Sequence, residues 1–167
     1  MSARRARPKD AQAAYDAAAK ILARGAYGFD GLVAKLLAKG FDDDIAREGV
    51  QRLKDLGLLD ESRSAEAIVH ATTRDLPAGE ALLRAKLEQR GVDIDASDDA
   101  LRNASTGRDE ALDAKLLARQ ALQRMPDSLD DASKARRLLG LLGRRGFTED
   151  HALDAVRALV PRAFDAD

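Results

Sequence analysis

The chain contains no cysteine and no tryptophan, and aromatic residues make up only 4% of its 167 residues. Without cysteine there is no disulfide framework, thiolate metal ligand or cysteine nucleophile, so a cytoplasmic location is expected. The shortage of aromatic rings argues against a protein that binds single strands by stacking their bases. No run of about 18 apolar residues is present to span a membrane, and the N-terminus lacks the apolar core of a signal peptide.

An excess of one charge is also lacking, because 28 basic residues face 29 acidic ones and the net charge is −1. No global field therefore directs the chain to nucleic acid, and any charge-driven partner must be met by a local patch. Residues 1–9 are basic and indicate a short disordered arm. This arm is either a solvated tail or a contact to nucleic acid or an acidic protein surface.

Motifs for catalysis are missing as well, since HExxH, GxSxG, GxxxxGK[ST] and GxGxxG do not occur. Glu66 and His70 stand four residues apart on one predicted helix, but a metal site needs further ligands, and none has a suitable spacing. Aspartates cluster where predicted helices begin, and capping explains them without catalysis. We therefore predict that the protein is not an enzyme and uses no cofactor and no metal.

The apolar residues that are present, mainly Leu and Ala, recur at helical spacing and show no strand-like alternation. We expect Gly25 to end the first helix, Asp30 and Asp60 to cap the second and fourth, and Pro77 to lie in the first turn of the fifth. The pattern predicts an all-α chain with nine helices, at about residues 10–24, 30–39, 43–56, 61–73, 77–90, 95–103, 108–124, 129–145 and 149–160.

One phrase occurs three times, as LLAKGFDDD, KLEQRGVDID and LLGRRGFTED, centred on Gly40, Gly91 and Gly146. These glycines are 51 and 55 residues apart. Leucine precedes each glycine by eight and by four residues, a basic residue precedes it directly, an apolar residue follows it, and Asp or Thr comes second after it. Leucines on one helix face, a left-handed glycine and a following cap describe a helix–turn–helix joint.

Three joints predict three tandem units of three helices each, which stack into an elongated, curved array that binds along a surface. The predicted division is an arm at 1–9, repeats at 10–57, 58–105 and 106–161, and a tail at 162–167.

Basic residues gather on the second helix of each predicted repeat, where they form either a stripe for phosphates or acidic protein, or merely the solvated side of amphipathic helices. Arg63, in the fourth predicted helix, and Arg74, directly after it, are further candidates. The candidate partner-binding residues are Lys35, Lys39, Arg63, Arg74, Arg84, Lys86, Arg90, Arg136, Arg137, Arg144 and Arg145.

Three segments carry a resemblance to a known family: LLAKGFDDDIAREGVQRLKDLGLLDESRSAEAIV (36–69), PAGEALLRAKLEQRGVD (77–93) and RRLLGLLGRRGFTEDHALDAV (136–156). In this order they resemble RecX, the regulatory protein of the bacterial RecA recombinase, over about residues 10–160. The resemblance implies three-helix repeats and a non-enzymatic partner of RecA filaments on single-stranded DNA. Such proteins inhibit ATP hydrolysis, strand exchange and coprotease activity in recombination, DNA repair and the SOS response.

The chain departs from the family pattern at residues 25–32, where Asp30 is the expected substitute cap, and at Ser64, where relatives carry an aromatic residue. The loss of that aromatic residue weakens a packing anchor or, if the position faces the partner, the binding. We expect a monomer that binds RecA, with weak direct DNA binding as an open alternative. The rival hypotheses are a DNA-binding repeat protein that acts without RecA and a helical scaffold for an unrelated protein.

Overall fold

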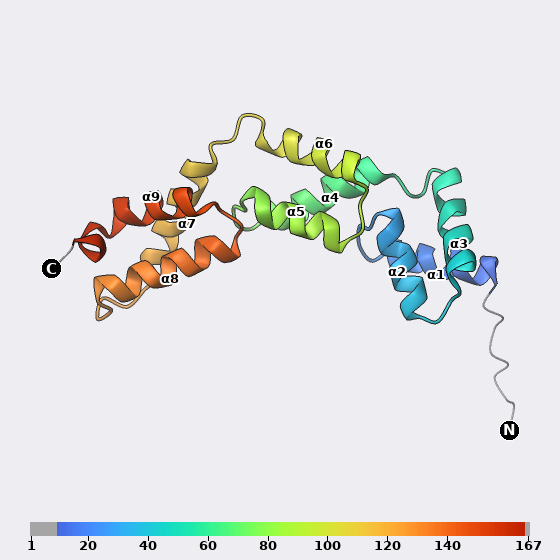
Figure 1. Cartoon of the computed structure of the whole chain (residues 1–167), viewed down its shortest axis with the longest axis horizontal. Helices are drawn as coiled ribbons and strands as arrows, with labels where there is room; N and C mark the ends of the chain where they lie inside the picture. Colours follow the sequence, from blue (N-terminus) through green and yellow to red (C-terminus); the bar gives the residue numbers. More distant parts are fainter. Residues whose placement is uncertain (1–9, 166–167) are drawn as a thin grey trace, which may run out of the picture. The chain divides into compact units, whose positions relative to one another are not determined.

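The computed structural model describes residues 10–165, which form nine α-helices and a short 3₁₀ helix and contain no strand (Figure 1). The predicted arm, residues 1–9, lies outside the described residues, as do residues 166 and 167. The all-α prediction is confirmed. The elements are α1 (Ala11–Leu22), α2 (Phe29–Ala38), α3 (Asp43–Asp55), α4 (Glu61–Thr73), α5 (Glu80–Gln89), α6 (Ile94–Ser105), α7 (Glu110–Leu122), α8 (Asp131–Arg144), α9 (Glu149–Leu159) and η1 (Pro161–Phe164).

The chain divides into two compact units. Of the residues that the structure describes, the first unit comprises 10–68 and 87–100, and the second comprises 69–86 and 101–165. The first is built on α1, α2 and α3, the second on α7, α8 and α9, and each takes part of the intervening helices. Within residues 10–165, no helix is both long and apolar enough to cross a membrane.

The core of the first unit contains small residues between α1 and α3. Alanine and glycine let these two helices approach closely. A Cβ added to Gly49 of α3 would lie 2.7 Å from the Cβ of Ala14. Burial of the apolar side chains of this core away from water is the main favourable term in folding. The buried residues of this core are Ala14, Ala18, Leu32, Val33, Leu36, Ala46, Val50, Leu53 and Leu59.

The second unit has an equivalent core, in which α7, α8 and α9 contribute alanines and longer aliphatic side chains. Phe147, which follows the third joint glycine, is 6% exposed and is part of this core. Its burial explains why the joint carries an apolar residue directly after the glycine. The buried residues are Ala114, Leu117, Ala118, Ala135, Leu138, Leu142, Phe147, Ala152, Ala155, Val156 and Val160.

The three predicted joints are confirmed at the level of the backbone. Gly40, Gly91 and Gly146 have φ values of 83°, 63° and 81°, in the left-handed region that side chains disfavour. In each joint the N–H of the residue after the glycine donates to the carbonyl of the leucine four before it, at 3.1, 3.2 and 3.1 Å. This is the bond that closes a helix ending in a left-handed glycine. The recurring phrase therefore encodes one repeated turn.

The predicted caps are confirmed in part. Asp93 and Thr148 accept hydrogen bonds from the N–H groups of Ala96 and His151, and Asp60 accepts one from the N–H of Arg63. Asp42 holds the N-cap position of α3, but its side chain makes no capping bond.

Three local predictions are wrong. Helix α1 ends at Leu22 with Ala23 as its C-cap, and Gly25 is not in the left-handed conformation. Gly28, not Asp30, is the N-cap of α2. Pro77 precedes α5, which begins at Glu80, so it lies in the connection rather than in the first turn. The first error arises because the N–H groups of Arg24 and Gly25 bond carbonyls three residues back and close the end of α1 without a left-handed glycine.

Candidate partner-binding surface

Arg90, one of the candidate arginines, lies at a close backbone contact in the first unit. We call this contact the first junction; it is formed by Gly28, Gly31, Glu61, Arg90 and Gly91. The N–H of Gly28 donates to the carbonyl of Arg90 at 2.9 Å. The Arg90 guanidinium donates to the carbonyl of Ala26 at 3.3 Å and lies 4.5 Å from the centre of the Tyr27 ring. A guanidinium at this distance from a ring is held by a cation–π attraction. Arg90 therefore helps to dock the start of α2 against the turn after α5.

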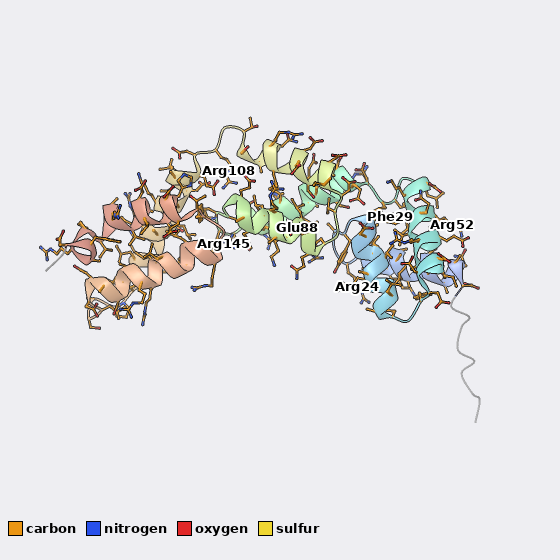
Figure 2. The ribbon with its side chains drawn as sticks, viewed as in Figure 1. Arg24, Phe29, Arg52, Glu88, Arg108 and Arg145 are labelled. Carbon is orange, nitrogen blue, oxygen red and sulfur yellow. The ribbon has the colours of Figure 1, made fainter. Side chains whose placement is uncertain are left out.

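Glu61 completes the first junction by bonding two backbone groups at once. One carboxylate oxygen accepts from the N–H of Phe29 at 2.6 Å and the other accepts from the N–H of Asp93 at 3.0 Å. Gly28 has no side chain to cap α2, and Glu61 satisfies one of the N–H groups in the first turn that have no partner within the helix. Its negative charge also lies at the positive end of that helix dipole. Phe29 is labelled in Figure 2.

The second unit contains the same contact, which we call the second junction, formed by Gly79, Arg108, Glu110, Arg145 and Gly146. The N–H of Gly79 donates to the carbonyl of Arg145 at 2.8 Å, and the N–H of Glu80 donates to a Glu110 oxygen at 3.3 Å. The Arg145 guanidinium, labelled in Figure 2 together with Arg108, donates to three carbonyls. Its acceptors are Pro77 at 2.9 Å, Thr72 at 3.0 Å and Leu76 at 2.7 Å.

Glycine is required at both junctions because the backbones nearly touch. A Cβ on Gly31 would lie 2.0 Å from the carbonyl oxygen of Arg90, and one on Gly79 would lie 2.2 Å from that of Gly146. Real Cβ atoms do not approach so closely, so either substitution forces the backbones apart. The sequence reasoning did not identify these two glycines or the two junction glutamates.

The other candidate residues lie at the surface and differ in what they contact. Arg74 forms an ion pair with Asp75 at 3.2 Å, and the hydrogen bond and charge of this pair raise the pKa of Arg74 and lower that of Asp75. Arg84 pairs with Glu80 at 2.9 Å, and the Lys35 ammonium lies 5.8 Å from the Tyr27 ring centre. Exposed pairs of this kind contribute little to stability. They leave the side chains available for exchange with a partner.

Helix α8 carries the densest basic set. Arg136, Arg137 and Arg144 are all exposed, and none of them forms an ion pair with another described residue. At about 100° of rotation per residue, these arginines share one helix face with Gly140 and Gly143. We call these five residues the α8 face. Opposite it, Ala135, Leu138 and Leu142 are buried in the core.

Apart from Lys39, Arg90 and Arg145, which directly precede the joint glycines, the basic residues of the three second helices do not occupy equivalent positions. Lys35 and Lys86 are 51 residues apart, as are the joint glycines of the first two repeats, but the equivalent residue in α8 is Leu141. In the same register, Ala81, Leu82 and Gln89 of α5 stand where α8 has Arg136, Arg137 and Arg144. The α8 face is therefore specific to the third repeat.

Ser64, which replaces an aromatic residue of the family pattern, is 8% exposed and lies among the buried residues of α4. This position faces the interior of the protein. The departure consequently affects packing rather than a surface that a partner touches.

Comparisons with known proteins give consistent results. No protein-family model matches the chain. Regulatory protein RecX of Mycolicibacterium vanbaalenii is 38% identical over 132 residues, which are 76% of this chain and 71% of the relative. Regulatory protein RecX of Chlorobaculum tepidum is 31% identical over 147 residues, 88% of each chain.

Solved structures show the same fold. The crystal structure of RecX from Lactobacillus salivarius superimposes with a TM-score of 0.66 at 21% identity, covering 90% of this chain and 96% of that one. A second crystal structure of regulatory protein RecX also gives a TM-score of 0.66, at 20% identity, with 91% and 73% coverage.

The helical fold and the curated relatives together define an all-helical regulatory protein. The chain belongs to the RecX family, and the resemblance to regulators of the RecA recombinase found in the sequence is confirmed.

Proposed function

We propose that this protein binds RecA and RecA filaments on single-stranded DNA, and inhibits ATP hydrolysis, strand exchange and coprotease activity. The observation that supports this function is the 38% identity to a regulatory protein RecX over 76% of the chain. The effect on RecA comes from binding alone. The protein acts in recombination, DNA repair and the SOS response.

We infer that the contact with the RecA filament, including its bound DNA, is made by the exposed basic residues, while Arg90 and Arg145 act indirectly by holding the junctions. Both of these side chains donate to backbone carbonyls inside their own unit. A guanidinium that is bonded in this way is not free to meet an acidic partner. The remaining contact set is Lys35, Lys39, Arg63, Arg74, Arg84, Lys86, Arg136, Arg137 and Arg144.

The first test is ATP hydrolysis by RecA filaments on single-stranded DNA, with RecA from the same source and this protein titrated in below filament stoichiometry. Suppression at substoichiometric amounts is the expected result, because one bound molecule affects neighbouring filament subunits. Full hydrolysis at stoichiometric protein, in filaments shown to be active, would overturn the proposal.

A charge reversal then tests the surface. Arg63, Arg136, Arg137 and Arg144 are exposed, so their replacement by Glu leaves both junctions intact. We expect inhibition to fall at least about tenfold in potency at an unchanged melting midpoint, because repulsion replaces attraction. The matched control reverses Arg24, Lys54, Lys115 and Arg119, which are equally exposed and lie outside the proposed set. Equal inhibition by both folded variants would contradict this assignment of the surface.

We further infer that the protein acts as a monomer in the cytoplasm. The absence of cysteine supports the location. Sedimentation equilibrium tests the oligomeric state, and a mass near 18.0 kDa is expected. A second candidate function, direct binding of DNA without RecA, is favoured by the arginines of α8.

A further inference from the structure

We propose that the α8 face, formed by Arg136, Arg137, Gly140, Gly143 and Arg144, binds the phosphate backbone of a polynucleotide. The proposal rests on the proposed function, because it assigns DNA phosphates to part of the surface given there to the RecA filament. It is nevertheless tested without RecA, so the two can fail separately.

The three arginines lie within an arc of about 100° on one face of the helix. Arg136 and Arg144 are eight residues apart, about 12 Å along the axis at 1.5 Å per residue, and Arg137 lies seven residues before Arg144 on the same face. A helix face of this length offers guanidinium groups to successive phosphates of one strand. Arginine binds phosphate through two parallel hydrogen bonds, which a lysine ammonium does not make.

Folding accounts for these arginines only in part, through the position of Arg144 in the last turn of α8, where a positive charge complements the helix dipole. Their only described electrostatic contact is that of Arg136 with Asp130, whose pKa is lowered mainly by hydrogen bonds from Ser133 and to a small extent by this charge. Arg137 stands in register with Gly31 and Leu82, which contact a joint glycine in the two junctions. In α8 the equivalent position is exposed.

The two glycines of the face are not explained by folding. A Cβ on Gly140 would meet only the flexible end of the Arg144 side chain at 3.2 Å, and one on Gly143 would meet nothing within 4 Å. Glycine is less favourable than alanine in the interior of a helix. Its effect here is to leave the helix backbone bare between the arginines, so that a phosphate chain lies close to the helix while the guanidinium groups reach it from both sides.

Composition favours nucleic acid over protein as the occupant. Protein interfaces draw their affinity from apolar and aromatic anchors in a desolvated centre, and the α8 face contains no such side chain. Phosphate contacts need only positive charge and hydrogen-bond donors. With no aromatic ring to stack on bases, binding should not distinguish DNA sequences.

The experiment measures binding of the full chain to a fluorescent 30-nucleotide single strand and to the corresponding duplex by anisotropy, from about 20 to 200 mM salt. Neutralising three phosphates predicts a slope of log affinity against log salt of about −2.7 for duplex and about −2 for the single strand. Replacing Arg136, Arg137 and Arg144 by Gln should lower affinity at least about tenfold at low salt and flatten the slope. The control replaces Arg24, Lys54 and Arg119 by Gln and should bind as the parent protein does.

Gly143 provides a second, matched pair of variants. Nothing lies within 4 Å of the added Cβ, so both Gly143→Glu and Gly143→Gln should fold. The carboxylate should weaken DNA binding several-fold more than the isosteric amide. Absence of DNA binding by the parent protein, equal binding by the Arg136, Arg137 and Arg144 variant, or binding of poly-glutamate in preference to DNA would each overturn the proposal. Whether the Arg136, Arg137 and Arg144 variant still inhibits RecA has no bearing on this test.

Discussion

At the first junction an acid supplies most of the side-chain bonding, whereas at the second an arginine does. Glu61 accepts from two backbone N–H groups, and Arg90 donates to one carbonyl at 3.3 Å. At the second junction Arg145 donates to three carbonyls, and Glu110 accepts one longer bond at 3.3 Å. The backbone contact itself, a glycine N–H donating to an arginine carbonyl, is the same at both.

This difference shows what is constrained and what is interchangeable. Two backbones that nearly touch leave room only for glycine, so the residue at this contact cannot be replaced by one with a side chain. The backbone groups around it must be bonded, and this is done mainly by an acid that accepts from N–H groups at the first junction and by an arginine that donates to carbonyls at the second. Substitutions at matched positions separate these two levels.

The largest effect should come from Gly91→Ala and Gly146→Ala, and it should be similar in both. Each Cβ would lie on a left-handed residue and within 2.0 Å and 2.2 Å of the facing backbone nitrogens, those of Gly31 and Leu82. Strain and overpacking together predict a loss of about 3 kcal/mol or more in the free energy of unfolding, measured in urea. Gly57→Ala is the control, since its φ is 70° but nothing lies near, and about 1–2 kcal/mol is expected. Equal losses at all three positions would show that the close approach contributes nothing.

Arg145→Met and Arg90→Met should differ, in contrast to the glycines. The variant loses the three charge-assisted bonds of Arg145, two of them to half-buried carbonyls, so we expect a loss of about 2–3 kcal/mol. Arg90 loses one long bond and a ring contact, for which about 1 kcal/mol is expected. Denaturant titrations of the two variants check the order. A larger loss for Arg90→Met would reverse our assignment of the stronger arginine.

The glutamates should show the opposite order. Glu61→Gln keeps one acceptor oxygen of two, so one backbone N–H loses its partner and the unfolding free energy should fall by about 1–2 kcal/mol. Glu110→Gln keeps the acceptor that its single bond needs, and a loss below about 0.5 kcal/mol is expected. If both variants were equally stable, the second hydrogen bond accepted by Glu61 would contribute nothing to the free energy of unfolding.

The joints were predictable from the sequence because every group they use lies within about ten residues of one glycine. The junctions were not, because their partners are far apart in the chain: Glu61 is 32 residues from Phe29, and Arg145 is 68 residues from Pro77. Local capping rules favoured Asp30 at the start of α2, but the acid that bonds there comes from the start of α4. Arg90 and Arg145 were read as surface charges at helix ends, since their carbonyl acceptors have no sequence signal. The α8 arginines were found because exposure follows from helical periodicity alone.

The last effect has the opposite sign and concerns glycines that neither junction uses. Gly140→Ala and Gly143→Ala should each raise the unfolding free energy by up to about 1 kcal/mol, because alanine favours a helix interior and no backbone lies near the added Cβ. The same change at Gly31 or Gly79 should destabilise, since those Cβ atoms would lie 2.0 and 2.2 Å from a carbonyl oxygen. Parallel melts of the four variants measure the contrast. A destabilised Gly143→Ala would mean that folding itself requires this glycine. Its presence in the α8 face would then be explained without a partner.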